Sequence, residues 1–367
     1  MLKDFRNYKY KKKILCFLEA KNRFDLFYDI AKNNYDMLFF ISSLVSKDEF
    51  YRHKIAYLKN VFLCENNANK IRDLFLKVKI FGLHITTYCQ PSSAHIFGLK
   101  VVKLCNKVQI PVLELQHGMF QLGLHYYNAS KTLESDSLPV ESYADKCLSY
   151  YPVDDIKNQI VIGYPNFAKP APAIKGNYTL VLTNLHWNVY EKINVYKFYY
   201  AVIKFASENP SQIFLWLPHA GETLYGGINH TFIKSLLEIY PSAKKNFINV
   251  KENKVSSLVP TSEYIRKAGH VISTISTTLL DCEMYKKPTI IWESEETKVL
   301  LDKIKTKTSF RDYNDLCKVF YMPHSNLYLK SGLLLPYDNA AFREAVDKHY
   351  RQPPNSPNML SDILAMI

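Results

Sequence analysis

Short apolar runs alternate with segments of helical periodicity along the first half of the chain. The apolar runs predict buried strands at residues 13–18, 36–41, 83–88 and 110–115. Apolar residues recur at helical spacing between these runs, at residues 22–32, 67–75 and 94–107. Ser92 and Ser93 are favourable capping residues directly before the last of these helices. Because a strand flanks that helix on each side, the pattern predicts a βαβ unit and therefore a parallel sheet.

The same alternation returns in the second half of the chain. Strands are predicted at residues 178–183, 212–217, 247–250, 269–273 and 288–292. Helices are predicted at residues 195–208, 230–240, 261–268 and 276–285. The proline-rich residues 161–177 separate the two halves and are typical of a linker. We therefore expect two Rossmann-like α/β domains, residues 1–168 and 169–338, followed by terminal helices over residues 339–367.

The composition of the 367-residue chain is that of a globular protein with a basic surface. With 47 Lys and Arg against 34 Asp and Glu, the formal net charge is +13, which predicts an anionic partner. Nucleic acid, an anionic membrane surface and a phosphorylated substrate all fit, as does a basic surface that binds nothing. The 11 glycines, about 3% against a usual 7% or so, argue against many glycine-cradled phosphates.

What the sequence lacks excludes several kinds of protein and site. The longest apolar stretch, residues 37–45, is far shorter than the roughly 20 residues of a membrane-spanning helix. The seven cysteines have no CxxC spacing, which favours free thiols and a cytoplasmic location. No GxGxxG, HxxxH or DxD motif occurs, so no metal or other cofactor is expected. Aromatic residues such as Tyr199 and Tyr200 lie in apolar runs and are expected in the core.

Hydroxyl residues gather between a predicted strand and a predicted helix in the second half of the chain. They are Thr274, Ser276, Thr277 and Thr278. The amino end of a helix has unpaired N–H groups and a partial positive charge, which suits a phosphate. Asp281 follows about one turn later, where a carboxylate is able to accept hydrogen bonds from ribose hydroxyls. Helix capping alone is the other explanation of these hydroxyl residues.

Two histidines directly follow predicted strands. His219, with Glu222 close behind it, follows one strand, and His117 stands between Gln116 and Gly118 after another. In doubly wound sheets, ligands bind beyond the carboxyl ends of the strands. His219 is suited to donate a hydrogen bond to a phosphate, and His117 to remove a proton from an attacking hydroxyl. A surface or structural histidine is the alternative at each position.

Together these motifs resemble the GT-B glycosyltransferases of bacterial surface-polysaccharide assembly. These include capsule and lipopolysaccharide sialyl- and Kdo-transferases and the related teichoic acid polymerases. The family pattern is a strand ending in His-Pro, then a Ser/Thr cluster followed by Glu-Ala-x-x-x-Gly-Lys-Pro. Pro218-His219 and residues 273–288 match it here, and Gln116-His117-Gly118 matches a Gln-His-Gly-like element of the first domain. Residues 161–166 resemble the Gly-Asn-Pro element that precedes the crossing between domains.

The resemblance covers roughly residues 80–292 and includes departures from the family pattern. Ala220 stands where the family has Pro, Asp281 where it has Glu, and Lys286 where it has Gly. The aspartate shortens the reach to a ribose and keeps the charge. The changes at Ala220 and Lys286 weaken any assignment to one particular donor.

The resemblance implies a GT-B fold, in which two Rossmann-like domains face each other across a cleft. The first domain would bind the acceptor and the second the nucleotide sugar, and the helices of residues 339–367 would cross back to the first. His117 would be the general base, with Gln116 and Gly118 in the acceptor site. Donor binding would fall to His219, Glu222, Thr274, Ser276, Thr277, Thr278 and Asp281.

The implied activity is a metal-independent transfer of a sugar from a nucleotide-activated donor to a growing capsule or lipopolysaccharide glycan. CMP-sialic acid and CMP-Kdo are slightly favoured over UDP donors. The implied partners are the lipid-linked or lipopolysaccharide glycan and the anionic inner face of the membrane, on which a basic protein docks peripherally. No nucleic acid is expected. The alternatives are an alditol-phosphate transferase with a CDP-activated donor, a UDP-sugar glycosyltransferase, and a non-catalytic binding protein with the same fold.

Overall fold

The computed structural model describes part of the first half of the chain and most of the second. The described residues are 14–18, 37–42, 61–64, 83–86, 111–116, 145–152, 159–168, 174, 176–185, 190–219, 222, 227–252, 259–303 and 308–349. The chain divides into two compact units. Unit 1 contains the described residues up to Pro165 and from Pro336 onward, and unit 2 those from Asn166 to Leu335. The helices predicted at 22–32, 67–75 and 94–107 lie outside the described residues.

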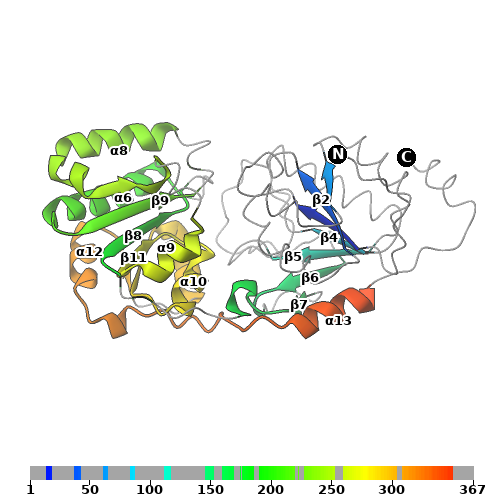
Figure 1. Cartoon of the computed structure of the whole chain (residues 1–367). Coiled ribbons are helices and arrows are strands. Elements are labelled where there is room, and N and C mark those ends of the chain that lie inside the picture. The colour runs from blue at the N-terminus through cyan, green and yellow to red at the C-terminus, as the bar shows by residue number, and fades with distance from the viewer. Residues whose placement is uncertain are drawn as a thin grey trace, which may run out of the picture. The chain divides into compact units, whose positions relative to one another are not determined.

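Unit 1 is built on a parallel sheet with the strand order β3-β2-β1-β4-β5-β6-β7 (Figure 1). Its strands are β1 (Ile14–Leu18), β2 (Met37–Ser42), β3 (Val61–Cys64), β4 (Leu83–Thr86), β5 (Val112–Leu115), β6 (Lys146–Ser149) and β7 (Gln159–Val161). The four predicted strands are confirmed as β1, β2, β4 and β5. The order 3-2-1-4-5-6 is that of a Rossmann sheet, extended here by one strand.

Unit 2 has a second parallel sheet, in the order β10-β9-β8-β11-β12-β13. Its strands are β8 (Tyr178–Thr183), β9 (Ile213–Pro218), β10 (Phe247–Asn249), β11 (His270–Ser273), β12 (Thr289–Trp292) and β13 (Ser309–Phe310). Numbered within the unit, this order is again 3-2-1-4-5-6. Every strand predicted for the second half is confirmed, and the two-residue β13 was not predicted.

The helices of unit 2 lie on its parallel sheet (Figure 1). They are α6 (Lys192–Glu208), α8 (Gly227–Ile239), α9 (Thr261–Lys267), α10 (Thr278–Met284), α11 (Lys298–Lys303) and α12 (Tyr313–Phe320). Short 3-10 turns complete the unit at η3 (Pro165–Ala168), η4 (Pro241–Lys245), η5 (Val250–Glu252), η7 (Glu295–Thr297) and η8 (His324–Asn326). Helix α6 contacts α8 and α12, whereas α9 contacts α10. The helices predicted at 195–208, 230–240, 261–268 and 276–285 are confirmed.

Aromatic side chains fill the core of unit 2 between α6 and the sheet. Phe198 of α6 packs edge-on against Trp292 of β12, with ring centroids 5.8 Å apart. Tyr199 packs in the same way against Trp216 of β9, at 5.7 Å. The expectation that Tyr200 is also a core residue is wrong, because 41% of it is exposed. Successive helical residues point about 100° apart, so Tyr200 leaves the buried face that Tyr199 occupies.

The segments that leave and re-enter unit 1 run side by side. Tyr164 pairs with Pro336 in a parallel bridge, and the Asp338 N–H donates to the carbonyl of Ile162 at 2.8 Å. Gly163 has φ of +74°, and a Cβ atom there would lie 1.9 Å from the Pro336 carbonyl oxygen. Only glycine fits both conditions. Helix α13 (Asn339–His349) follows and contacts β7, and the rest of the tail lies outside the described residues.

Each unit thus has a parallel sheet with the strand order of a doubly wound α/β fold, and the predicted helices of unit 2 are present with it. In the part of the chain that the structure describes, no helix is long and apolar enough to cross a membrane. Cys282 and Cys317 are free thiols there.

Candidate functional site

The candidate site lies at the carboxyl edge of the unit 2 sheet, between β8 and β11. The strand order reverses its direction at this pair, and ligands of such sheets bind beyond the carboxyl ends of the strands at this point. The two loops are joined at their base. The Thr274 N–H donates to the Leu182 carbonyl at 3.1 Å, and the Asn184 N–H donates to Thr274 Oγ1 at 2.9 Å.

The loop after β9 brings His219 to the same edge. The His219 N–H donates to the Thr183 carbonyl at 3.0 Å, and the His219 carbonyl accepts from the Glu222 N–H at 3.0 Å. His219 is half-buried. Its backbone is fixed on β8, and the predicted position of His219 beyond the carboxyl end of a buried strand is confirmed.

Glu222 lies inside the unit, with only 1% of it exposed. Its Oε2 accepts hydrogen bonds from the Thr183 hydroxyl and the Tyr199 phenol, both at 2.9 Å. Its Oε1 accepts from the Leu185 N–H at 2.9 Å. Burial raises the pKa of Glu222, and these hydrogen bonds act in the opposite direction. Because the chain's own donors occupy both oxygens, Glu222 is built to hold the loops after β8 and β9 together.

Thr274 and Asp281 are also inside the unit. Thr274 is fully buried. The phenol of Tyr190 forms hydrogen bonds with the Thr274 side chain and with the backbone of Ile275. Burial raises the pKa of that phenol. Asp281 is 5% exposed and lies in the first turn of α10. The residues predicted to bind a donor therefore divide into an inner set, Glu222, Thr274 and Asp281, and a set nearer the surface.

The set nearer the surface consists of Ser276, Thr277 and Thr278, which are half-buried, together with His219. Helix α10 begins at Thr278, two residues later than predicted, because residues 276 and 277 form the turn that leads into it. The Thr278 N–H donates to Ser276 Oγ over a long 3.4 Å. Thr278 Oγ1 and Asn184 Oδ1 are buried atoms without a hydrogen-bond partner in the described part of the chain. Such atoms are uncommon and favour a ligand or water at this place.

The turn that ends α10 contains Lys286, which stands where the glycosyltransferases that this sequence resembles have glycine. The Lys287 N–H donates to the Cys282 carbonyl at 2.9 Å and the Lys286 N–H to the Glu283 carbonyl at 3.1 Å, which is a Schellman motif. This motif needs a residue with positive φ at the position of Lys286, and its φ is 49°. Glycine, the residue of the family pattern, adopts that conformation without steric cost.

Lys287 fixes the turn from the other side. It is 3% exposed, and its Nζ donates to the carbonyls of Ile174 and Ala268 at 2.7 and 2.8 Å. Burial lowers the pKa of its ammonium group. Lys287 therefore joins the segment that enters unit 2 to the loop before β11. Its role is to stabilise the fold of the site rather than to contact a ligand.

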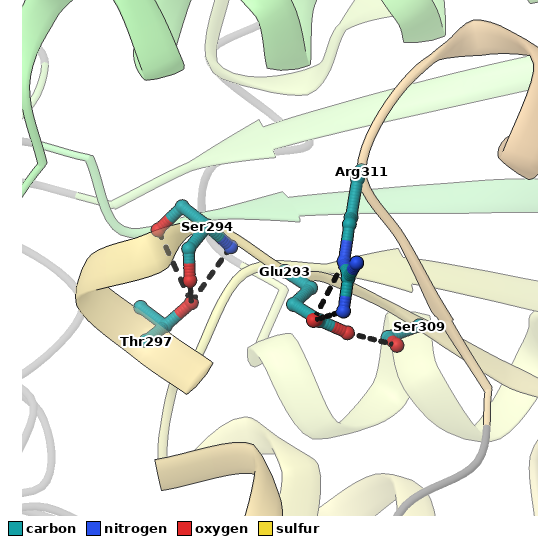
Figure 2. Close-up of polar contacts among 5 residues, drawn as sticks. All are labelled: Glu293, Ser294, Thr297, Ser309 and Arg311. Atoms are coloured by element: carbon teal, nitrogen blue, oxygen red, sulfur yellow. Dashed lines mark hydrogen bonds and ion pairs between the residues drawn. The ribbon is translucent and has the colours of Figure 1, made fainter. Parts of the chain in front are cut away.

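A further polar cluster lies at the ends of β12 and β13 (Figure 2). Glu293 accepts hydrogen bonds from Ser309 Oγ at 2.5 Å and from Arg311 Nε at 2.7 Å, and Arg311 also donates through its Nη2. Beside it, Ser294 and Thr297 cap each other at the start of η7. Sequence reasoning missed this cluster because β13 is too short to leave a periodic signal.

The predicted acceptor-site residues of unit 1 are described only in part. Gln116 directly follows β5 and is 1% exposed. Its N–H donates to the Leu148 carbonyl at 2.9 Å, and its Oε1 accepts from the Tyr150 N–H at 2.6 Å. Gln116 therefore fastens the end of β5 to β6. His117 and Gly118 lie outside the described residues, so their roles remain predictions.

Comparisons with known proteins indicate the fold but no family. No protein-family model matches the sequence, and no curated protein matches it. Solved structures are similar over nearly the whole chain. MnaA of S. aureus, solved with UDP, has 9% sequence identity and a TM-score of 0.59, over 97% of this chain and 98% of that one.

Two other solved structures are similar to this chain. A UDP-GlcNAc 2-epimerase from Neisseria meningitidis, bound to UDP-GlcNAc, has 12% identity and a TM-score of 0.56, over 92% of this chain and 99% of that one. The wall teichoic acid polymerase TagF, as an H444N variant, has 11% identity and a TM-score of 0.50, over 99% and 91%. The chain has a GT-B fold of two Rossmann-like units.

Sequence reasoning missed Thr183, Asn184 and Tyr199. Thr183 ends the predicted strand at 178–183 and Asn184 follows it, so the rule that ligands bind at strand ends was a sufficient signal for both. Tyr199 was correctly expected in the core, but its hydrogen bond to Glu222 had no signal in the sequence. In the described residues, no group of His, Cys, Asp or Glu is arranged to hold a metal ion.

Proposed function

We propose that the chain is a nucleotide-sugar-dependent glycosyltransferase that binds its donor at the β8 and β11 ends of unit 2. The observation that carries this proposal is that His219, Asn184 and the hydroxyl residues Ser276 to Thr278 all follow strand ends at or next to the point where the strand order reverses. The unpartnered Asn184 Oδ1 suits a donor N–H or O–H group of the nucleoside. The unpartnered Thr278 hydroxyl suits a phosphate oxygen.

The two sets of residues have different roles in this proposal. His219 and the three hydroxyl residues contact the donor and stabilise the phosphate that leaves with the nucleotide. Glu222 and Thr274 hold the loops that carry them, through buried hydrogen bonds of 2.9 Å. Asp281 stays a candidate for the ribose. No step needs a metal, because the histidine and the hydroxyl groups supply the hydrogen-bond donors that a leaving phosphate needs.

We take UDP as the first nucleotide to test. Two of the similar proteins were solved with UDP or UDP-GlcNAc bound. The CMP-sialic acid or CMP-Kdo donor expected from the motifs therefore has no support from the similar structures. CMP and CDP remain in the experiment as alternatives, the latter for an alditol-phosphate transferase.

The acceptor in this proposal is a growing capsule or lipopolysaccharide glycan, and His117 is its general base. The net charge of +13 favours a peripheral position on an anionic inner membrane surface, where a lipid-linked acceptor would lie. The similarity to a teichoic acid polymerase is consistent with polymer assembly. Nucleic acid is not part of the proposal.

A nucleotide-sugar epimerase is the second candidate. The similarity to a protein named as a UDP-GlcNAc 2-epimerase favours it, with a TM-score of 0.56. The two reactions differ in their need for an acceptor. An epimerase converts UDP-GlcNAc into an isomeric nucleotide sugar by itself, whereas a glycosyltransferase releases the nucleotide and transfers the sugar.

The decisive experiment is thermal unfolding of the purified chain with UDP, CMP, CDP and GDP in separate samples. We expect one nucleotide to raise the melting temperature, and the His219→Ala and Thr278→Val variants to lose most of that shift. Thr231→Val, on the exposed side of α8, is the matched control and should keep it. A chain that no nucleotide stabilises would contradict the proposal. Incubation with the matching nucleotide sugar, with and without a glycan acceptor, then separates transferase from epimerase.

A further inference from the structure

A lysine beyond the predicted motifs lies at the same edge of the unit 2 sheet. Lys251 is in η5, directly after β10, and η5 contacts the neighbouring strand β9. Its backbone N–H donates to Asn249 Oδ1 at 3.0 Å, which fixes the turn at the end of the strand. Lys251 is half-buried.

The charge of Lys251 is only partly balanced. The charged group that acts on it is the carboxylate of Glu222, and burial lowers the pKa of the Lys251 ammonium. Glu222 already accepts hydrogen bonds from Thr183, Tyr199 and the Leu185 N–H. No ion pair among the described residues includes Lys251. A half-buried lysine whose nearby carboxylate already accepts three hydrogen bonds retains its capacity to bind a further anion.

We infer that Lys251 binds a phosphate group of the nucleotide-sugar donor, beside His219. This inference rests on the proposed function and adds a cation that the sequence motifs do not include. The parallel strands β9 and β10 end at one edge, so the residues that follow them approach the same ligand. A lysine supplies a point charge and three N–H donors to phosphate oxygens, and the buried Glu222 keeps that charge favourable in a partly desolvated place.

The experiment measures binding by isothermal titration calorimetry with a nucleotide and with its nucleoside. UDP and uridine are used, or CMP and cytidine if the nucleotide panel selects CMP. We expect Lys251→Gln to weaken UDP binding by about tenfold or more, the size of a lost charge-assisted hydrogen bond, and to leave uridine binding unchanged. Lys251→Arg keeps the charge and should retain most of the affinity.

Lys245 provides a matched control, because it is exposed and precedes β10, at the opposite edge of the sheet. Lys245→Gln removes the same charge and should leave UDP affinity unchanged. Equal losses in both variants, or an equal loss for uridine and UDP in Lys251→Gln, would overturn the inference. So would unchanged UDP binding by Lys251→Gln. A wild-type chain that binds no nucleotide would instead reject the proposed function, on which the inference depends.

Discussion

The phenol of Tyr199 donates a hydrogen bond of 2.9 Å to the carboxylate of Glu222, and both residues are buried. Tyr199 belongs to α6, and Glu222 to the segment after β9. Thr183, at the end of β8, donates to the same oxygen at 2.9 Å and accepts from the Trp216 indole at 3.1 Å. One carboxylate therefore joins a helix and the ends of two strands beneath the candidate site.

Removal of this carboxylate should destabilise unit 2 strongly. Glu222→Ala leaves three buried donors without an acceptor, and we expect the free energy of unfolding to fall by about 2–4 kcal/mol. Tyr199→Phe removes one hydrogen bond and should cost about 1 kcal/mol. Urea unfolding followed by circular dichroism measures both. The control is Tyr196→Phe, because its hydroxyl forms no hydrogen bond among the described residues. Equal losses of unfolding free energy in Tyr196→Phe and Tyr199→Phe would contradict the role of Glu222.

Lys286→Gly should stabilise the chain. Lys286 has φ of 49°, a conformation that costs a side-chain-bearing residue about 1 kcal/mol or more and glycine little. We expect a gain of about 0.5–1 kcal/mol in the free energy of unfolding, after allowance for the greater freedom of glycine in the unfolded chain. Urea unfolding measures it, and Lys286→Ala, which keeps the Cβ atom, should show no comparable gain. A loss of stability in Lys286→Gly would show that the backbone of Lys286 is not strained in the native protein.

Gly163→Ala should destabilise the crossing between the units more than Gly332→Ala does. Both glycines have positive φ, +74° and +71°. A Cβ atom at Gly163 would lie 1.9 Å from the Pro336 carbonyl oxygen, whereas nothing lies within 4 Å of one at Gly332. We expect about 1–2 kcal/mol of backbone strain at Gly332 and a larger loss at Gly163. Differential scanning calorimetry compares the two variants, and equal shifts would argue against the close contact.

Acid should weaken unit 2 through His270. Its ring stacks on Phe320, with centroids 4.5 Å apart, and meets the His324 ring edge-on at 4.6 Å. Burial, together with the charge of His324, lowers the pKa of His270 from 6.5 to about 4. The unfolded chain therefore takes up this proton first. The contribution to stability is complete above pH 6.5 and is lost as the pH falls from 6.5 towards 4.

The His270→Gln variant isolates this effect from the other titrating groups. We expect the free energy of unfolding of the wild type to fall by about 1–2 kcal/mol more than that of the variant between pH 7 and pH 4.5, a value reduced because the ring is partly exposed. Urea unfolding at a series of pH values measures the difference. Parallel pH profiles for the two proteins would show that folding does not lower the pKa of His270, and would contradict this prediction.

Much of the fold was predictable because the longer strands are apolar and lie between turn residues. Strands β8, β9 and β11, and helix α6, have periodic signals of several residues, and each was predicted within a few residues of its bounds. Strands β3, β6, β7 and β13 were missed, although they are no shorter, β13 apart, than several strands that were predicted. Such strands form because a neighbouring strand offers its backbone groups, which is a property of the folded sheet and not of the local sequence.

The sequence predicted where the candidate site lies in the fold, but not which of its side chains contact one another. The sequence by itself determined that His219, Ser276 and Thr278 follow buried parallel strands, since strand ends and helix starts are local properties of the chain. Only the tertiary structure decided that Glu222 and Thr274 point inward, onto Tyr199 and Asn184. The physical reason is that a buried polar group needs partners, and those partners come from elements up to 90 residues away along the chain.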